Sequence, residues 1–62
     1  MPVIRLDSSA LNKEQKQQLV SELTAVASRI TKIPEDAFVV YLGEYDRDNI
    51  GVAGKLLSEH SK

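Results

Sequence analysis

The sequence predicts an α+β protein whose centre is a β-α-β unit. Apolar residues recur at helical spacing over residues 13–32, and segments rich in β-branched residues flank this stretch at 2–6 and 38–44. The second flanking segment is apolar on both faces, which is typical of a strand in a parallel sheet. We therefore expect two parallel strands joined through one helix.

Residues 2–6 form the first predicted strand, with Ile4 and Leu6 on the same face. Pro2 can open this strand because a first residue need not donate a hydrogen bond to the ladder. The polar residues 7–9 that follow predict a break between the strand and the helix.

Asn12 is a good helix N-cap, and Gln15 stands three residues later, as a capping box requires. The helix is expected over residues 13–32 and is expected to stop before Pro34, because a residue that precedes proline is pushed out of the helical region. One apolar stripe follows from the spacing, made of Leu19, Val20, Leu23, Val26, Ala27, Ile30 and Ile33.

The second strand, residues 38–44, carries apolar side chains on both faces, with Val40 and Leu42 on one and Val39 and Tyr41 on the other. One helix can cover only one face of a sheet. We therefore expect another copy of the chain to cover the opposite face.

The C-terminal region begins with a charged turn at residues 46–49. Gly51 and Gly54 follow it, and this spacing predicts a tight hairpin with both glycines at positive φ. Residues 55–62 are expected to form a polar tail.

Composition limits the function. The 62 residues suit a single domain spanning 1–62, and a formal net charge of -1 argues against a nucleic-acid partner. The longest apolar run, 38–42, is far shorter than the roughly 20 residues of a membrane-spanning helix, so no membrane partner is expected. No secretory leader opens the chain, which makes a cytoplasmic location the default expectation.

Size itself predicts self-association. A chain of about 60 residues buries only ~60% of its unfolded surface and is marginally stable alone. Small domains compensate with disulfides, metals or oligomerisation. With 0 cysteines and 1 histidine, this chain is left with oligomerisation.

Pro2 is the candidate catalytic residue. Removal of Met1, which is usual before a small residue, would leave a secondary amine at the N-terminus. An apolar pocket lowers the pKa of an amine, and a neutral amine near pH 7 is a competent general base. The alternative is a proline that merely opens a strand. The single imidazole, His60, is expected to be a solvated tail residue.

Several motifs together resemble the 4-oxalocrotonate tautomerase family, in particular its short, DmpI-like subgroup. The resemblance covers nearly the whole chain. Its elements are Met1-Pro2-Val3-Ile4, Asn12-Lys13-Glu14-Gln15-Lys16, Ile33-Pro34, Val39-Val40 and Asn49-Ile50-Gly51-Val52-Ala53-Gly54-Lys55.

The resemblance implies a β-α-β fold with a C-terminal hairpin, in which two copies form a four-stranded sheet with two helices. It also implies a homohexamer, a trimer of dimers, with active sites at subunit contacts. Pro2 would be the general base that interconverts enol and keto forms of a small 2-oxo acid-like substrate. No cofactor would be needed.

The chain departs from the family at the substrate-binding positions. The family's arginine before the helix has no counterpart in residues 9–11, its arginine on the second strand falls on Val39, and its aromatic wall residue falls on Ile50. We expect poor turnover of a dicarboxylate and preference for a less charged keto–enol compound. Arg47 is the best substitute cation, unless it is a solvated turn residue paired with a neighbouring aspartate, and Tyr41 is a possible hydrogen-bond donor, unless it packs at a subunit contact.

Two other functions stay open from the sequence. One is a proline-dependent decarboxylase, dehalogenase-type lyase or hydratase on the same scaffold, which would need an acid near Pro2; Asp7 and Glu44 are the acids on the two strands. The other is a catalytically weak oligomeric binding module.

Overall fold

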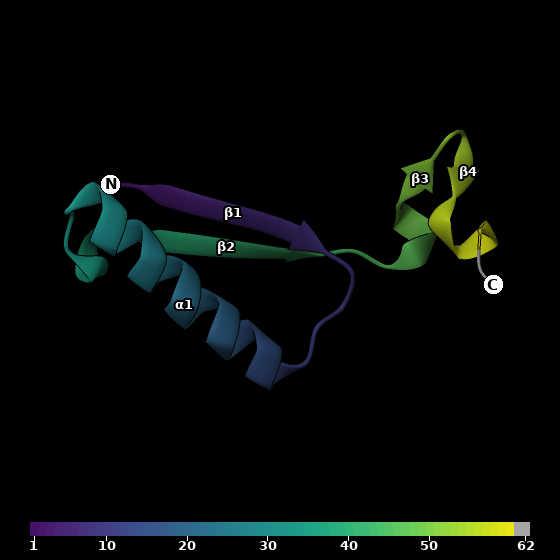
Figure 1. The fold of residues 1–62 in the computed structure, drawn as a ribbon. Coiled ribbons are helices and arrows are strands. Elements are labelled where there is room, and N and C mark those ends of the chain that lie inside the picture. Colours follow the sequence, from purple (N-terminus) through teal and green to yellow (C-terminus); the bar gives the residue numbers. More distant parts are fainter. Residues whose placement is uncertain (61–62) are drawn as a thin grey trace.

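Residues 3–44 form a helix packed along a two-stranded parallel sheet, and a small hairpin projects from one end of that sheet (Figure 1). The computed structural model describes residues 1–60, so the last two residues of the predicted polar tail lie outside it. The elements are β1 (Val3–Ser8), α1 (Lys13–Thr31), β2 (Val39–Glu44), β3 (Gly51–Val52) and β4 (Lys55–Leu56), with short 3₁₀ turns at Glu35–Ala37, Arg47–Asn49 and Leu57–Glu59.

The two long strands pair in parallel, as expected, with Val3 opposite Val39 and Ser8 opposite Glu44. β1 continues two residues beyond the predicted strand, into the segment that was expected to be a polar break. The reason is tertiary, because the second strand supplies pairing partners up to its own end, and the Tyr45 N–H then donates to the Ser8 carbonyl at 3.0 Å.

Both predicted signals at the start of α1 are confirmed. The Asn12 side chain accepts a hydrogen bond from the Gln15 N–H at 2.8 Å, and the Gln15 side chain accepts one from the Asn12 N–H at 3.0 Å. The predicted end holds to within one residue, since the helix stops at Thr31, before Pro34. Lys32 adopts a left-handed conformation (φ 66°), and its N–H donates to the Ser28 carbonyl at 2.9 Å.

The helix leaves one face of the sheet uncovered. On that face, Val3 and Tyr41 each expose 49% of their surface. None of residues 1–60 is fully buried. The accessible surface is 4848 Å², against about 4000 Å² for a compact monomer of this mass. The radius of gyration is 14.9 Å, against about 10.6 Å for a compact chain of this length.

The apolar stripe of α1 is also wider than the sheet beneath it. Leu19 and Leu23 are half-buried on the stripe, while Val26 and Ile30 on the same stripe stay exposed, Ile30 by 66%. Two strands about 4.8 Å apart are too narrow to cover a stripe of that width. A wider sheet would be needed to cover the rest of the stripe.

The C-terminal hairpin lies at the opposite end of the sheet from the N-terminus (Figure 1). Its turn places Ala53 (φ 56°) and Gly54 (φ 83°) in left-handed conformations. The prediction was therefore right for Gly54 and wrong for Gly51, which lies in β3, where the ladder requires extended backbone. The charged turn at 46–49 folds as a 3₁₀ turn.

Within residues 1–60, α1 is the longest helix, and neither it nor any other helix has the length and apolar character to cross a membrane.

Replacing Asn12 with Ala should lower the free energy of unfolding by about 1 kcal/mol, because the capping box loses the acceptor for one N–H of the first turn. Thermal or urea unfolding at a fixed protein concentration measures the loss. Asn12→Asp keeps the acceptor and should stay close to the parent protein. An Asn12→Ala protein as stable as the parent would show that the cap contributes nothing.

Candidate active site

Pro2 lies immediately before β1, at the end of the sheet farthest from the hairpin (Figure 1). Its side chain is half-buried, whereas Met1 before it is 85% exposed. The Pro2 carbonyl accepts a hydrogen bond from the Val39 N–H at 3.0 Å. This bond fixes the backbone of Pro2 against the start of β2, so a nitrogen freed by loss of Met1 would be attached to an anchored residue.

Val39 and Tyr41 lie on β2 at the same end of the sheet as Pro2. The register places Val39 opposite Val3 and Tyr41 opposite Arg5. The Arg5 guanidinium lies 5.1 Å from the centre of the Tyr41 ring, in cation–π contact. Tyr41 is thus held on the uncovered face.

Arg47 and Ile50 lie at the other end, next to the hairpin. Arg47 lines an open pocket of about 390 Å³ and donates from Nη2 to the Leu57 carbonyl at 3.2 Å. Ile50 is half-buried, and its carbonyl accepts from the Leu57 N–H at 2.7 Å. The predicted alternative pairing of Arg47 with a neighbouring aspartate is not formed, because Asp48 instead accepts a hydrogen bond from the Ser58 hydroxyl.

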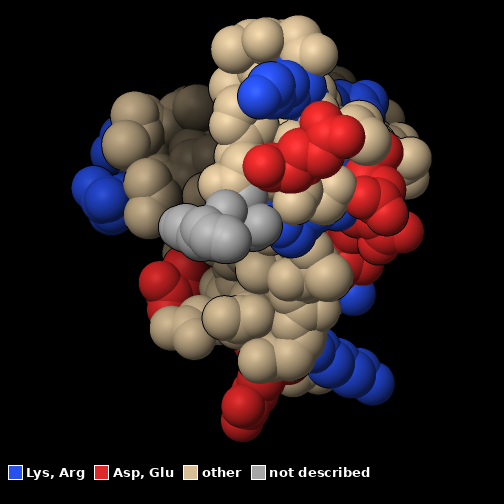
Figure 2. All heavy atoms as spheres, turned by 90° about the vertical axis from the view of Figure 1, so that its right-hand side faces the viewer, with Lys and Arg blue, Asp and Glu red and all other residues tan. Residues whose placement is uncertain are grey.

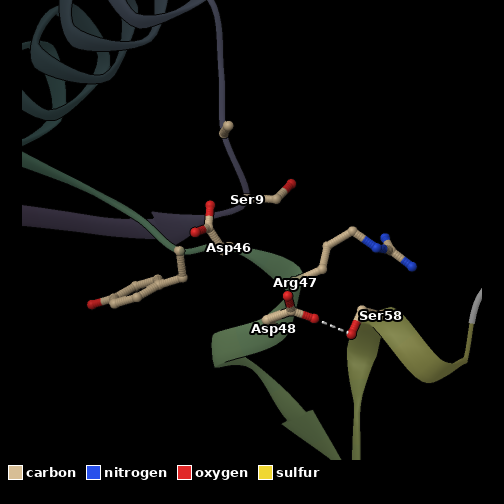
Figure 3. Close-up of a pocket in the computed structure, with 7 residues that line it drawn as sticks. Ser9, Asp46, Arg47, Asp48 and Ser58 are labelled. Carbon is tan, nitrogen blue, oxygen red and sulfur yellow. Dashed lines mark hydrogen bonds between the residues drawn. The ribbon is translucent and has the colours of Figure 1, made fainter.

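The pocket at Arg47 lies between the loop after β1 and the hairpin (Figure 3). In Figure 3, Arg47 extends on the side of Ser58, and Asp46 points toward the loop that carries Ser9. The lining residues are Ser9, Ala10, Tyr45, Asp46, Arg47, Asp48 and Ser58. Arg47 is the one cation among them.

One chain therefore divides the predicted site residues between two ends. Pro2, Val39 and Tyr41 form one group, and Arg47 and Ile50 form the other. The strand between them, from Pro2 to Ser8, spans about 20 Å at the usual rise per residue. An arginine side chain cannot bridge that distance, so within a single chain these residues do not act on one small molecule.

Glu44 holds the loop after β1 in place. Its carboxylate accepts from the Leu11 N–H at 2.9 Å and forms an ion pair with Lys16 at 2.9 Å. The hydrogen bond from the Leu11 backbone, followed by the contact with Lys16, lowers the pKa of Glu44. Glu44 is opposite Ser8 at the hairpin end of the sheet, so in its own chain it lies away from Pro2.

Charge is mixed at the hairpin end, where acidic and basic side chains are interspersed on the face shown in Figure 2. Within residues 1–60, no three His, Asp or Glu side chains are close enough together to hold a metal ion. His60 is exposed, as expected, and its Nε2 lies 3.0 Å from the Val52 carbonyl.

Three sets of contacts near the candidate site were not anticipated from the sequence: Glu44 with Leu11 and Lys16, Asp48 with Ser58, and Arg5 with Tyr41. The parallel register could have indicated the last of these, since it sets Arg5 opposite Tyr41. The other two join segments whose approach depends on the loop and hairpin conformations.

Comparison with known proteins finds a match to the family described as tautomerase enzyme, over residues 2–60. Among its relatives, the chain is 39% identical to 2-hydroxymuconate tautomerase of Bacillus subtilis over 46 residues, which cover 74% of each protein.

Solved structures agree. The fold matches DmpI from Archaeoglobus fulgidus with a TM-score of 0.84 and 32% identity, covering 92% of this chain and 98% of that one. It matches a 4-oxalocrotonate tautomerase homologue with a TM-score of 0.86 and 32% identity, covering 100% of both chains. The family resemblance and the fold class predicted from the sequence are confirmed.

Replacing Glu44 with Gln should lower the thermal unfolding midpoint at pH 7, because the carboxylate's interactions with Leu11 and Lys16 weaken. A lowered pKa in the folded state means that this stabilisation is present above the ordinary Glu pKa of about 4.3 and is lost as pH falls through the folded value. The difference between the two proteins should therefore be largest near neutral pH and shrink as the pH falls below that ordinary value. A pH-independent difference would contradict the electrostatic explanation. Glu35→Gln, at an exposed site, is the matched control.

Proposed function

Because the chain belongs to the tautomerase family, we propose that it is an isomerase that interconverts the enol and keto forms of a small 2-oxo acid, with Pro2 as its general base after Met1 is removed. The observation that carries the proposal is the family match, which begins at residue 2, together with the position of Pro2 at the anchored start of β1. The family supports tautomerase chemistry, and Pro2 is the residue to which we assign it.

The proposed reaction moves one proton. The neutral Pro2 nitrogen accepts a proton from the hydroxyl of the enol or dienol. The resulting secondary ammonium then returns a proton to a carbon of the same molecule. No atoms are gained or lost, and the step needs no redox partner. Partial burial of Pro2 favours the neutral amine, because desolvation disfavours the charged form.

We further propose that the working site forms between copies of the chain, as in a homohexamer built from three dimers. Two observations support this: the described residues include none that is fully buried, and the two groups of site residues lie at opposite ends of one sheet. In such an assembly, the hairpin end of one copy lies beside Pro2 of another. Residues 1–62 act as a single domain in this proposal.

Arg47 is the proposed anchor for a substrate carboxylate. Its guanidinium makes one hydrogen bond to a carbonyl within residues 1–60, and a carboxylate is the partner its remaining donors suit best. Val39 and Ile50 would line the apolar part of the site, and the Tyr41 hydroxyl would donate to the enolate oxygen.

This set favours a substrate with one carboxylate. Valine at 39 and the absence of arginine from residues 9–11 leave fewer cations than a dicarboxylate needs. Phenylenolpyruvate, with one carboxylate and an apolar ring, is a suitable first assay substrate. 2-Hydroxymuconate, from the name of the Bacillus subtilis relative, is the comparison.

Replacing Pro2 with Ala should lower kcat by about 10²–10⁴-fold, the usual contribution of a positioned general base. Intact mass should show that Met1 is absent from the parent protein and from the variant, since alanine also permits its removal. The kcat/KM of the parent should rise with pH through a pKa below the ordinary value of about 8 for an α-amino group. Pro34→Ala is the control, and full activity in processed Pro2→Ala protein would disprove the assignment.

Replacing Arg47 with Ala should lower kcat/KM for phenylenolpyruvate by about 10–100-fold, because a charge-assisted hydrogen bond to the carboxylate is lost. Turnover of a neutral 1,3-diketone enol should change little. A purely structural role, through the bond to Leu57, would lower both activities alike. Arg29→Ala, an exposed site on α1, is the matched control.

A further inference from the structure

We propose that Arg5 and Asp7 fix the register in which a second copy of the chain adds to the free edge of β1. The two β1 strands would run antiparallel about a two-fold axis at Leu6, so that Arg5 of each copy faces Asp7 of the other. This inference rests on the proposed self-association and assigns the residues that direct it.

The free edge of β1 offers alternate backbone groups for pairing. The carbonyls of Pro2 and Ser8 accept from β2, so the even-numbered residues direct their hydrogen-bonding groups toward β2. The N–H and C=O groups of Val3, Arg5 and Asp7 therefore point to the open edge. An antiparallel partner strand that bonds to this edge must pair odd-numbered residues with odd-numbered residues.

Few registers satisfy that condition in a symmetric pair. A two-fold axis at Arg5 sets the two arginines opposite each other, and an axis at Asp7 does the same with the two aspartates. Like charges directly opposite are unfavourable. An axis at Ile4 leaves Asp7 without a charged partner. The axis at Leu6 gives two Arg5–Asp7 pairs and one Leu6–Leu6 contact.

The register with its axis at Leu6 also agrees with the side chains on the two faces of the sheet. Arg5 and Asp7 are exposed on the uncovered face, and within residues 1–60 neither forms an ion pair. Arg5 rests on the Tyr41 ring, and the Asp7 carboxylate occupies the space that a side chain at position 43 would fill, 2.5 Å from an ideal Cβ on Gly43. Leu6 lies on the opposite face, under α1. A second helix beside the first would then cover the stripe that a two-stranded sheet leaves exposed.

The register can be read directly with single cysteines, because the chain contains none. Leu6 pairs with itself at a non-hydrogen-bonded position, where the Cα atoms are about 4.5 Å apart and within disulfide range. Leu6→Cys should form a covalent dimer under mild oxidation. Ile4→Cys, which would face Ser8 of the second copy, should not. Cross-linking of Ile4→Cys with none at Leu6→Cys would overturn the proposed register.

Charge reversal tests whether Arg5 and Asp7 cause that register. Arg5→Asp and Asp7→Arg should each weaken dimer formation by about tenfold or more, because both attractive pairs become repulsive. An equimolar mixture of the two variants should associate as a heterodimer, and the Arg5→Asp/Asp7→Arg double variant should recover the homodimer. Lys32→Asp and Asp36→Arg, at exposed sites off the sheet, are the charge-matched controls.

Analytical ultracentrifugation and native mass spectrometry over a concentration series separate the outcomes. A parent protein that stays monomeric throughout overturns the proposed self-association and the register with it. A parent that assembles, with single variants that assemble equally well, leaves self-association standing and overturns the role of Arg5 and Asp7. Rescue in the mixture, with no change in the controls, supports the inference.

Discussion

One helix and two strands enclose too little space to bury a side chain completely, and the rest of this protein follows from that limit. α1 covers one face of the β1–β2 pair, while Val3 and Tyr41 remain exposed on the other. The accessible surface and the radius of gyration both exceed those of a compact chain of this size. Hydrophobic burial supplies most of the free energy of folding. In the proposed assembly, contact with further copies of the chain supplies the missing burial.

The same pairing decides where the chemistry can occur. The parallel register places Pro2 beside Val39 at one end of the sheet. At the other end, the chain leaves β2 after Glu44 and continues into the hairpin. Glu44 then ties the loop after β1 to the end of β2, next to the pocket that contains Arg47. Pro2 and Arg47 therefore lie at opposite ends of the sheet in one chain. The proposed enzyme needs its assembly for geometry as well as for stability.

Residue types and their spacing predicted the helix, the strands and the hairpin, while tertiary contacts decided where the strands end. The cap at Asn12, the parallel pairing and the hairpin followed from residue types and spacing. The extension of β1 to Ser8 did not, because it depends on the length of β2. The end of α1 before Pro34 was predicted to within one residue, but the left-handed conformation of Lys32 that closes the helix was not. For the candidate site, Pro2 and Val39 could be placed from the sequence, but the contacts of Arg47 depend on how the hairpin folds back onto Ile50 and Leu57.

If the working site forms between copies as proposed, the separation of Pro2 from Arg47 has an evolutionary consequence. After gene duplication, one chain can lose its proline and the other its arginine, and a mixed assembly still contains sites with one of each. Selection would then maintain the two genes together, since neither product suffices alone. A short protein whose proposed site residues lie at opposite ends is therefore well suited to become an obligate pair of specialised subunits.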